Sequence, residues 1–158
     1  MAQPTVDTSA QQNPSPNHCP KVGSTGIFIL VVDDNSINRI VSLKILERHG
    51  HAVATVDNGQ EVLDYLCKTS GNCQPDMVFM DTSMPVMDGY EATRRIRSDA
   101  GLFDEGIRTV PVIGLTANAL PGIGERMLEA GMDDYICVPI HPRDLQIAVM
   151  RGISPTDP

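Results

Sequence analysis

Residues 27–32 form an unbroken apolar run, Ile-Phe-Ile-Leu-Val-Val, that is followed directly by Asp33 and Asp34. A short apolar run rich in β-branched side chains and bounded by polar residues predicts a β-strand. Successive side chains of a strand point to opposite faces of its sheet, so a strand that is apolar throughout has no face in water. Such strands are typical of parallel sheets that helices cover on both sides. The run therefore favours an α/β fold.

Strand and helix patterns alternate along the rest of the chain. Further strands are predicted at residues 52–56, 77–81, 110–115 and 134–138. Five helices are predicted between and after them, and residues 100–109 are expected to form a surface loop. The alternation predicts right-handed βαβ crossovers and a doubly wound, five-stranded parallel sheet with five helices.

The first predicted helix follows Asp33 and Asp34. Ser36 is expected to cap this helix, and Gly50 follows its last periodic residue. Apolar residues recur at helical spacing and are expected to share one buried face: Ile37, Ile40, Val41 and Ile45.

The length of 158 residues suits one domain. Residues 1–25 are rich in Gln, Pro, Ser and Asn and are expected to be a disordered leader. Residues 26–151 form the predicted domain, and residues 152–158 are expected to be a disordered tail.

Charge and composition limit the possible partners. The net charge of −8, from 20 acidic and 12 basic residues, argues against binding to nucleic acid, which needs a basic face. No segment approaches the roughly 20 apolar residues of a membrane span, and no secretory signal is visible. We therefore expect an intracellular protein, cytoplasmic with a nuclear location left open. The four cysteines have irregular spacing that fits neither a zinc site nor a disulfide framework.

Several polar side chains follow the predicted strands. Asp33 and Asp34 come after the first strand, Asp81 ends the third, and Thr116 ends the fourth. The carboxyl ends of parallel strands meet at one edge of the sheet, where ligands bind in open α/β folds. Carboxylates crowded at one edge repel one another unless a cation lies between them, and Mg²⁺ prefers oxygen ligands of this kind. An aspartate beside Mg²⁺ can accept a phosphoryl group, and Thr116 can donate a hydrogen bond to it.

With these residues the chain resembles a receiver domain of the response-regulator family, most closely the receivers of hybrid histidine kinases. The resemblance extends over about residues 27–150 and rests on four motifs in order: residues 31–35 (VVDDN), 80–89 (MDTSMPVMDG), 115–119 (LTANA) and 131–135 (GMDDY). It implies the flavodoxin-like receiver fold. It also implies a phosphoacceptor module of phosphorelay signalling and not an enzyme in its own right, served by a histidine kinase or a histidine phosphotransfer protein.

The resemblance assigns a role to each site residue. Asp81 would accept the phosphoryl group from a phosphohistidine. Asp33, Asp34, Asp81 and the backbone carbonyl of Ser83 would hold Mg²⁺, with Asp33 acting through water. Thr116 would bond the phosphoryl group, and Tyr135 would swing inward with it.

One position departs from the family pattern. Receivers carry a lysine before the proline that follows the fifth strand, and this chain has Val138 there. A charge-assisted hydrogen bond contributes about 1.5 to 3 kcal/mol, so its loss is expected to slow phosphotransfer and to weaken switching without removing the metal site.

Two other functions stay open from the sequence. Val138 also fits a pseudo-receiver that binds proteins without phosphorylation. A phosphatase with an aspartate nucleophile usually carries a second acid two residues later, and here that residue is Ser83. A dinucleotide-binding fold is poorly supported, because no glycine-rich turn follows the first strand.

Overall fold

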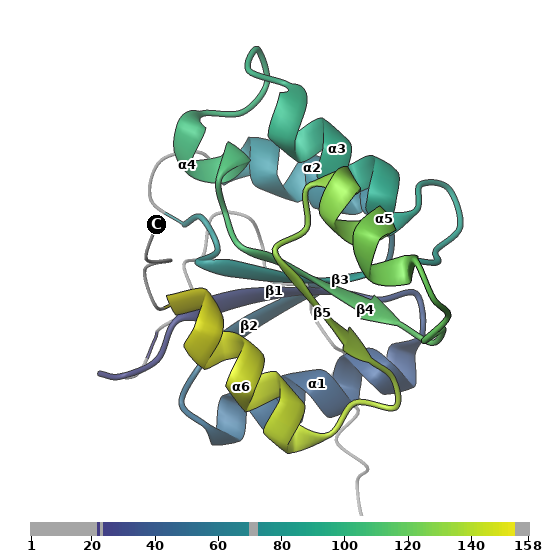
Figure 1. Ribbon diagram of the computed structural model, residues 1–158. Helices are drawn as coiled ribbons and strands as arrows, with labels where there is room; N and C mark the ends of the chain where they lie inside the picture. Colours follow the sequence, from purple (N-terminus) through teal and green to yellow (C-terminus); the bar gives the residue numbers. More distant parts are fainter. Residues whose placement is uncertain (1–21, 23, 70–72, 154–158) are drawn as a thin grey trace, which may run out of the picture.

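The computed structural model describes residues 22, 24–69 and 73–153. Five parallel strands form one sheet, as predicted, and their order in the sheet is β2-β1-β3-β4-β5 (Figure 1). Their bounds are β1 Phe28–Val32, β2 Ala52–Val56, β3 Met77–Asp81, β4 Val112–Thr116 and β5 Asp134–Cys137. From β1 the order runs outward in both directions, to β2 on one side and to β3 on the other. The doubly wound, flavodoxin-like fold is thereby confirmed, with its topological switch point between β1 and β3.

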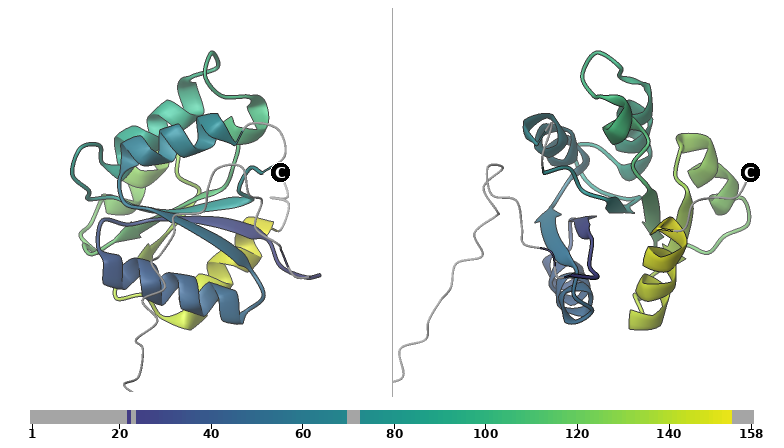
Figure 2. Two further views of the ribbon diagram at one scale, coloured as in Figure 1. Left: turned by 180° about the vertical axis from the view of Figure 1, so that it is seen from behind. Right: turned by 90° about the vertical axis from the view of Figure 1, so that its left-hand side faces the viewer.

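Helices cover both faces of the sheet (Figures 1 and 2). One face carries α1 Ser36–Arg48 and α6 Pro142–Ile153, and the other carries α2 Gly59–Lys68, α3 Gly89–Ser98 and α5 Ile123–Ala130. A sixth helix, α4 Glu105–Arg108, lies where a loop was predicted at residues 100–109. It forms because the Asp104 carboxylate accepts a hydrogen bond from the Ile107 N–H at 2.9 Å, and Ile107 is buried. The sequence predicted five helices, whereas the described residues form six.

The core has two layers, one on each side of the sheet. All five β1 residues are buried, and they alternate between the layers: Phe28, Leu30 and Val32 face α2, α3 and α5, while Ile29 and Val31 face α1 and α6. The prediction that β1 is apolar throughout because it is buried on both faces is thus confirmed.

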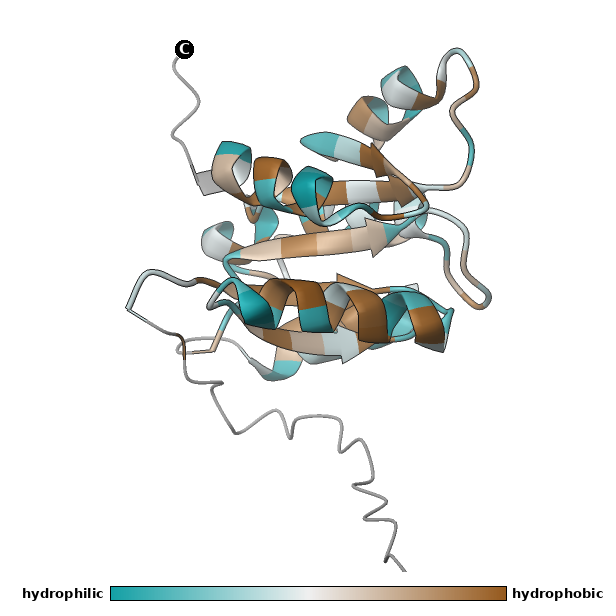
Figure 3. Ribbon diagram, turned by 90° about the horizontal axis from the view of Figure 1, so that it is seen from below, coloured by the Kyte–Doolittle hydropathy of each residue, from teal (hydrophilic) through white to brown (hydrophobic). Residues whose placement is uncertain are grey.

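The prediction for α1 was wrong in two details. Its N-cap is Asn35 and not Ser36, because the Asn35 side chain accepts hydrogen bonds from the N–H groups of Ile37 at 2.9 Å and of Asn38 at 3.3 Å. The expected buried face is also displaced: Ile37 is 69% exposed and Val41 41%, whereas Ser42 and Leu46 are buried. Apolar residues surround α1 on several sides, so their spacing does not select one face, and Figure 3 shows hydrophobic residues on its outward side.

Some predicted boundaries moved or lie outside the described residues. β4 begins at Val112, two residues later than predicted, and α6 continues through Gly152 to Ile153. The expected leader falls mostly on residues 1–21 and 23, and the expected tail mostly on residues 154–158, all outside the described residues. No helix in the described part of the chain has both the length and the apolar character needed to span a membrane.

Candidate functional site

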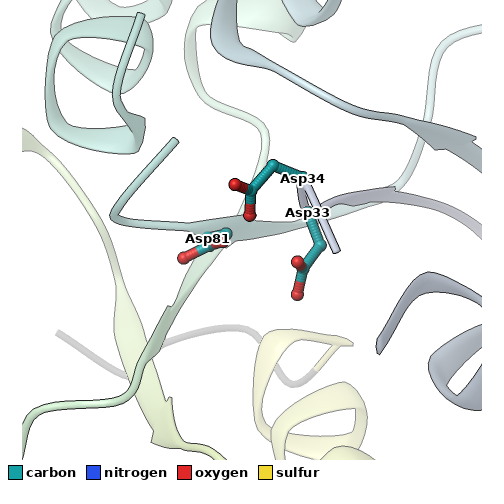
Figure 4. A group of neighbouring side chains, drawn as sticks. All are labelled: Asp33, Asp34 and Asp81. Atoms are coloured by element: carbon teal, nitrogen blue, oxygen red, sulfur yellow. The ribbon is translucent and has the colours of Figure 1, made fainter. Parts of the chain in front are cut away.

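Three carboxylates meet at the carboxyl edge of the sheet, at the switch point between β1 and β3 (Figure 4). Val32 pairs with Met80, which brings Asp33 and Asp34 beside Asp81. One oxygen from each carboxylate lies within 4.8 Å of the others, a spacing that allows all three to reach one metal ion. The structure therefore brings together the three side chains that the sequence predicted to converge.

Burial and mutual repulsion make this cluster costly to ionise. Burial and the nearby charges of Asp33 and Asp34 raise the pKa of Asp81 to about 7, although the backbone N–H of Ser83 donates to its Oδ1 at 3.1 Å and acts in the opposite direction. The pKa of Asp33 is also raised, chiefly by burial. A hard divalent cation is the ligand that relieves such repulsion, because all the available donors are oxygen atoms.

The segment after β3 fixes the position of Asp81. The hydroxyl of Thr82 donates to the Leu115 carbonyl at 3.2 Å, and the Gly89 N–H donates to the Thr82 carbonyl at 3.3 Å. A Cβ atom on Gly89 would collide with the carbonyl oxygen of Asp81, so only glycine permits this approach. These contacts hold the backbone next to Asp81 in place at the end of β3.

Val86 carries backbone strain within the same loop. Its φ is 69°, a left-handed value that a β-branched residue rarely adopts, and its side chain is 85% exposed. The buried side chains of Met84 and Met87 anchor both sides of this turn, and the Met87 N–H donates to the Pro85 carbonyl at 2.8 Å. Strained residues held in this way are found at ligand sites, which agrees with the position of this loop beside the carboxylates.

The remaining predicted site residues differ in their burial and in their contacts. Thr116 is buried, and its hydroxyl donates to the Asn118 carbonyl at 3.2 Å while accepting from the Asn118 N–H at 3.1 Å. Tyr135 lies on the edge strand β5, is 44% exposed and packs against Gly124 of α5. Val138 is half-buried and packs against the core layer beneath α1 and α6. The structure thus leaves Tyr135 turned outward and places an apolar group at position 138.

A cleft of about 520 Å³ opens next to the segment that follows β3 and Asp81. Its lining includes Ser83, Thr116, Tyr90 and Arg126. The guanidinium of Arg126 lies 4.6 Å from the centre of the Tyr90 ring. Neither residue was predicted from the sequence, because a contact between residues 36 positions apart on two helices leaves no signal in local spacing.

The family model of the response regulator receiver domain matches residues 29–150. The chain belongs to this family. It is 36% identical over 155 residues to probable histidine kinase 5 of Oryza sativa, a match that covers 85% of the chain and 12% of that relative. It is 38% identical over 139 residues to the sensor histidine kinase RcsC of Salmonella typhimurium, with 88% of the chain and 12% of that protein covered. This receiver domain therefore spans about an eighth of the length of these curated relatives.

A solved structure supports the same assignment. The receiver domain of a sensor histidine kinase from Pseudomonas aeruginosa is 39% identical to this chain and superposes with a TM-score of 0.69 over 81% of this chain and 98% of that one. That crystal structure has a magnesium ion coordinated in its active site cleft. The resemblance drawn from the four sequence motifs, to receivers of hybrid histidine kinases in two-component signalling, is thereby confirmed.

Proposed function

We propose that this receiver accepts a phosphoryl group on Asp81 from a phosphohistidine of a histidine kinase or a phosphotransfer protein. The observation that carries the proposal is the meeting of Asp33, Asp34 and Asp81 within 4.8 Å at the switch point of the sheet. The related receiver that binds magnesium in its cleft supports the same reading. A phosphoacceptor of this kind is a relay module and not an independent enzyme, and we place it inside the cell with its partner.

The carboxylate cluster fits Mg²⁺ as the resident ion. Asp34 and Asp81 would hold it directly and Asp33 through water, and the backbone carbonyl of Ser83 would add a further oxygen ligand. When bound, the ion neutralises charge on the transferring phosphoryl oxygens. The raised pKa of Asp81 supports this assignment, because a nearby cation restores the ionised form that acts as a nucleophile.

In the proposed step, an oxygen of the Asp81 carboxylate attacks the phosphorus atom of the phosphohistidine. The new O–P bond forms as the P–N bond breaks, and the electron pair of that bond returns to the imidazole nitrogen, which then takes a proton. The Ser83 N–H, which donates to Asp81 Oδ1, orients the attacking carboxylate. To bond the phosphoryl group, the Thr116 hydroxyl must release the Asn118 carbonyl. Tyr135 would then move inward from its exposed position.

Val138 favours a second candidate function. The half-buried valine cannot contribute the ammonium that the family pattern has at this position. Phosphorylation is therefore expected to be slower than in receivers that carry the lysine, and its coupling to Thr116 and Tyr135 to be weaker. The alternative is a pseudo-receiver that binds proteins in the same way with or without phosphate.

Incubation with Mg²⁺ and a small acyl phosphate, followed by intact mass measurement, tests the proposal. We expect a mass gain of one phosphoryl group in the natural chain and none in Asp81→Asn. Asp88→Asn is the matched control, because Asp88 caps α3 beside the same cleft and asparagine caps equally well. A chain that gains no mass would favour the pseudo-receiver, and an Asp81→Asn variant that still gains it would show that another residue carries the phosphoryl group.

A further inference from the structure

Arg126 is a cation without an anionic partner at the wall of the cleft. It lies in the first turn of α5, and its guanidinium stacks on the Tyr90 ring at 4.6 Å. Among the described residues, no carboxylate forms an ion pair with it. Asp88 lines the same cleft, but its carboxylate accepts a hydrogen bond from the Glu91 N–H at 2.8 Å as the cap of α3. In a chain of net charge −8, a guanidinium left free in a cleft is suited to an anion.

The cleft that Arg126 lines also reaches residues next to the proposed phosphoacceptor. Ser83, two residues after Asp81, and Thr116 both line it. Asp81 and Leu115 are register partners in β3 and β4, so Thr116 follows directly beside the end of β3. A phosphoryl group on Asp81 that accepts a bond from Thr116 would therefore face the cleft into which Arg126 projects.

Other arginines near this edge of the sheet are less suited to contact that phosphoryl group. Arg39 already donates from Nη1 to the backbone carbonyl of Asp33 at 2.6 Å. Arg143, at the start of α6, lies outside the cleft lining. Within the described part of the chain, the contact that holds the Arg126 guanidinium is the one with the Tyr90 ring, which is weaker at an exposed site than a charge-assisted hydrogen bond to phosphate. A phosphoryl group can therefore bind the Arg126 guanidinium with the smallest loss of existing interactions.

We infer that Arg126 supplies to the phosphoryl group on Asp81 the positive charge that Val138 cannot supply, by turning from the Tyr90 ring into the cleft. The inference rests on the proposed function and adds a catalytic residue from α5 to it. Tyr90 serves as the resting position of the guanidinium, and the chain compensates for its apolar residue at position 138 from the opposite side of the site.

The test compares arginine variants in the full chain with Mg²⁺ and acetyl phosphate as the donor. Arg126→Gln is expected to lower the rate of phosphoryl loading, followed by intact mass, by roughly tenfold or more, and Arg126→Lys to retain most of it. Arg48→Gln is the control, because it removes one positive charge at the end of α1, on the opposite edge of the sheet. Urea unfolding of each variant verifies that the fold is kept.

A second arm uses Val138→Lys. If Arg126 and a lysine at position 138 serve the same phosphoryl group, Val138→Lys should restore loading in Arg126→Gln and give a smaller gain in the natural chain, a non-additive result. Loading of Arg126→Gln equal to that of Arg48→Gln, in a natural chain that is phosphorylated on Asp81, would overturn the role of Arg126 and leave the proposed function standing. A natural chain that loads no phosphate, like Asp81→Asn, would overturn both.

Discussion

The guanidinium of Arg97 and the carboxylate of Asp133 lie 2.9 Å apart, although 36 residues separate them in the chain. Arg97 also donates to three backbone carbonyls, those of Gly131 at 2.9 Å, Arg108 at 2.9 Å and Val110 at 2.7 Å. The same Asp133 oxygen accepts the Val112 N–H at 2.8 Å. This one arginine therefore joins the last turn of α3 to the start of β4 and to the turn between α5 and β5.

Removal of the Arg97 side chain should destabilise the fold strongly. Arg97→Ala removes the guanidinium donor from three carbonyls and from the Asp133 carboxylate, and we expect a loss of roughly 3 kcal/mol in the free energy of unfolding, measured in urea. Arg94→Ala is the matched control, since Arg94 lies on the same helix but is half exposed, and its ion pair among the described residues is with the exposed Glu91. We expect Arg94→Ala to change stability little. Equal losses in the two variants would contradict the bracing role of Arg97.

The raised pKa of Asp81 predicts a stability that depends on pH. In the folded protein without metal its pKa is about 7, above the ordinary aspartate value of 3.8, so folding favours the neutral carboxyl. The stabilisation of the folded state by the Asp81 carboxyl is fully present below pH 3.8 and is lost as the pH rises through 7. Asparagine is neutral at every pH. In the presence of a chelator, Asp81→Asn should therefore be more stable than the natural chain at pH 8, by about 3 kcal/mol.

The comparison of the two proteins at pH 5 decides the cause. There most of the Asp81 carboxyl is protonated in the folded state, so the advantage of Asp81→Asn in urea unfolding should fall to less than half of its value at pH 8. An advantage that does not change with pH would show that the substitution acts through packing and not through the charge of Asp81.

Mg²⁺ should stabilise the folded chain and lose this effect when a ligand is removed. A ligand present at about 100 times its Kd adds roughly 2.7 kcal/mol to the free energy of unfolding. Asp34 is exposed, so Asp34→Asn should fold normally and yet show a much smaller rise in Tm with Mg²⁺. Asp88→Asn should respond to Mg²⁺ as the natural chain does. The response should weaken at pH 5, because protons compete with the ion for Asp81.

The sequence was most informative where the chain obeys one strong constraint. A strand buried on both faces must be apolar throughout, so the ends of β1 and β3 stand out as acids after apolar runs. Parallel strands then bring these ends to one edge, which is why the meeting of Asp33, Asp34 and Asp81 was predictable.

Other features depend on contacts that local spacing does not encode. The face of α1 was mispredicted because apolar residues surround that helix, and α4 was missed because four residues are too few for a period. The stacking of Arg126 on Tyr90 and the bridge from Arg97 to Asp133 each join residues 36 positions apart. Only the packing of the helices on the sheet creates such pairs.

Two glycines in the described structure should respond differently to a methyl group. On Gly89 a Cβ would meet the carbonyl oxygen of Asp81, which is backbone and cannot turn away. On Gly114 it would meet the Met132 sulfur at 2.8 Å and the Met127 methyl at 3.0 Å, both at the ends of flexible side chains. Gly89→Ala should therefore cost about 3 kcal/mol or more in urea unfolding, and Gly114→Ala less than about 1.5 kcal/mol.

The same substitution at Gly89 should also disturb the metal site. Because relief of the collision must displace the end of β3, the Asp81 carboxylate moves relative to Asp33 and Asp34, and the rise in Tm with Mg²⁺ should shrink in Gly89→Ala. Gly114→Ala should keep the full response, since Gly114 pairs with Met80, one residue before the acid, and the side chains of Met127 and Met132 can absorb its collision. A Gly89→Ala variant with normal stability and a normal Mg²⁺ response would show that the end of β3 is not held as tightly as the structure indicates.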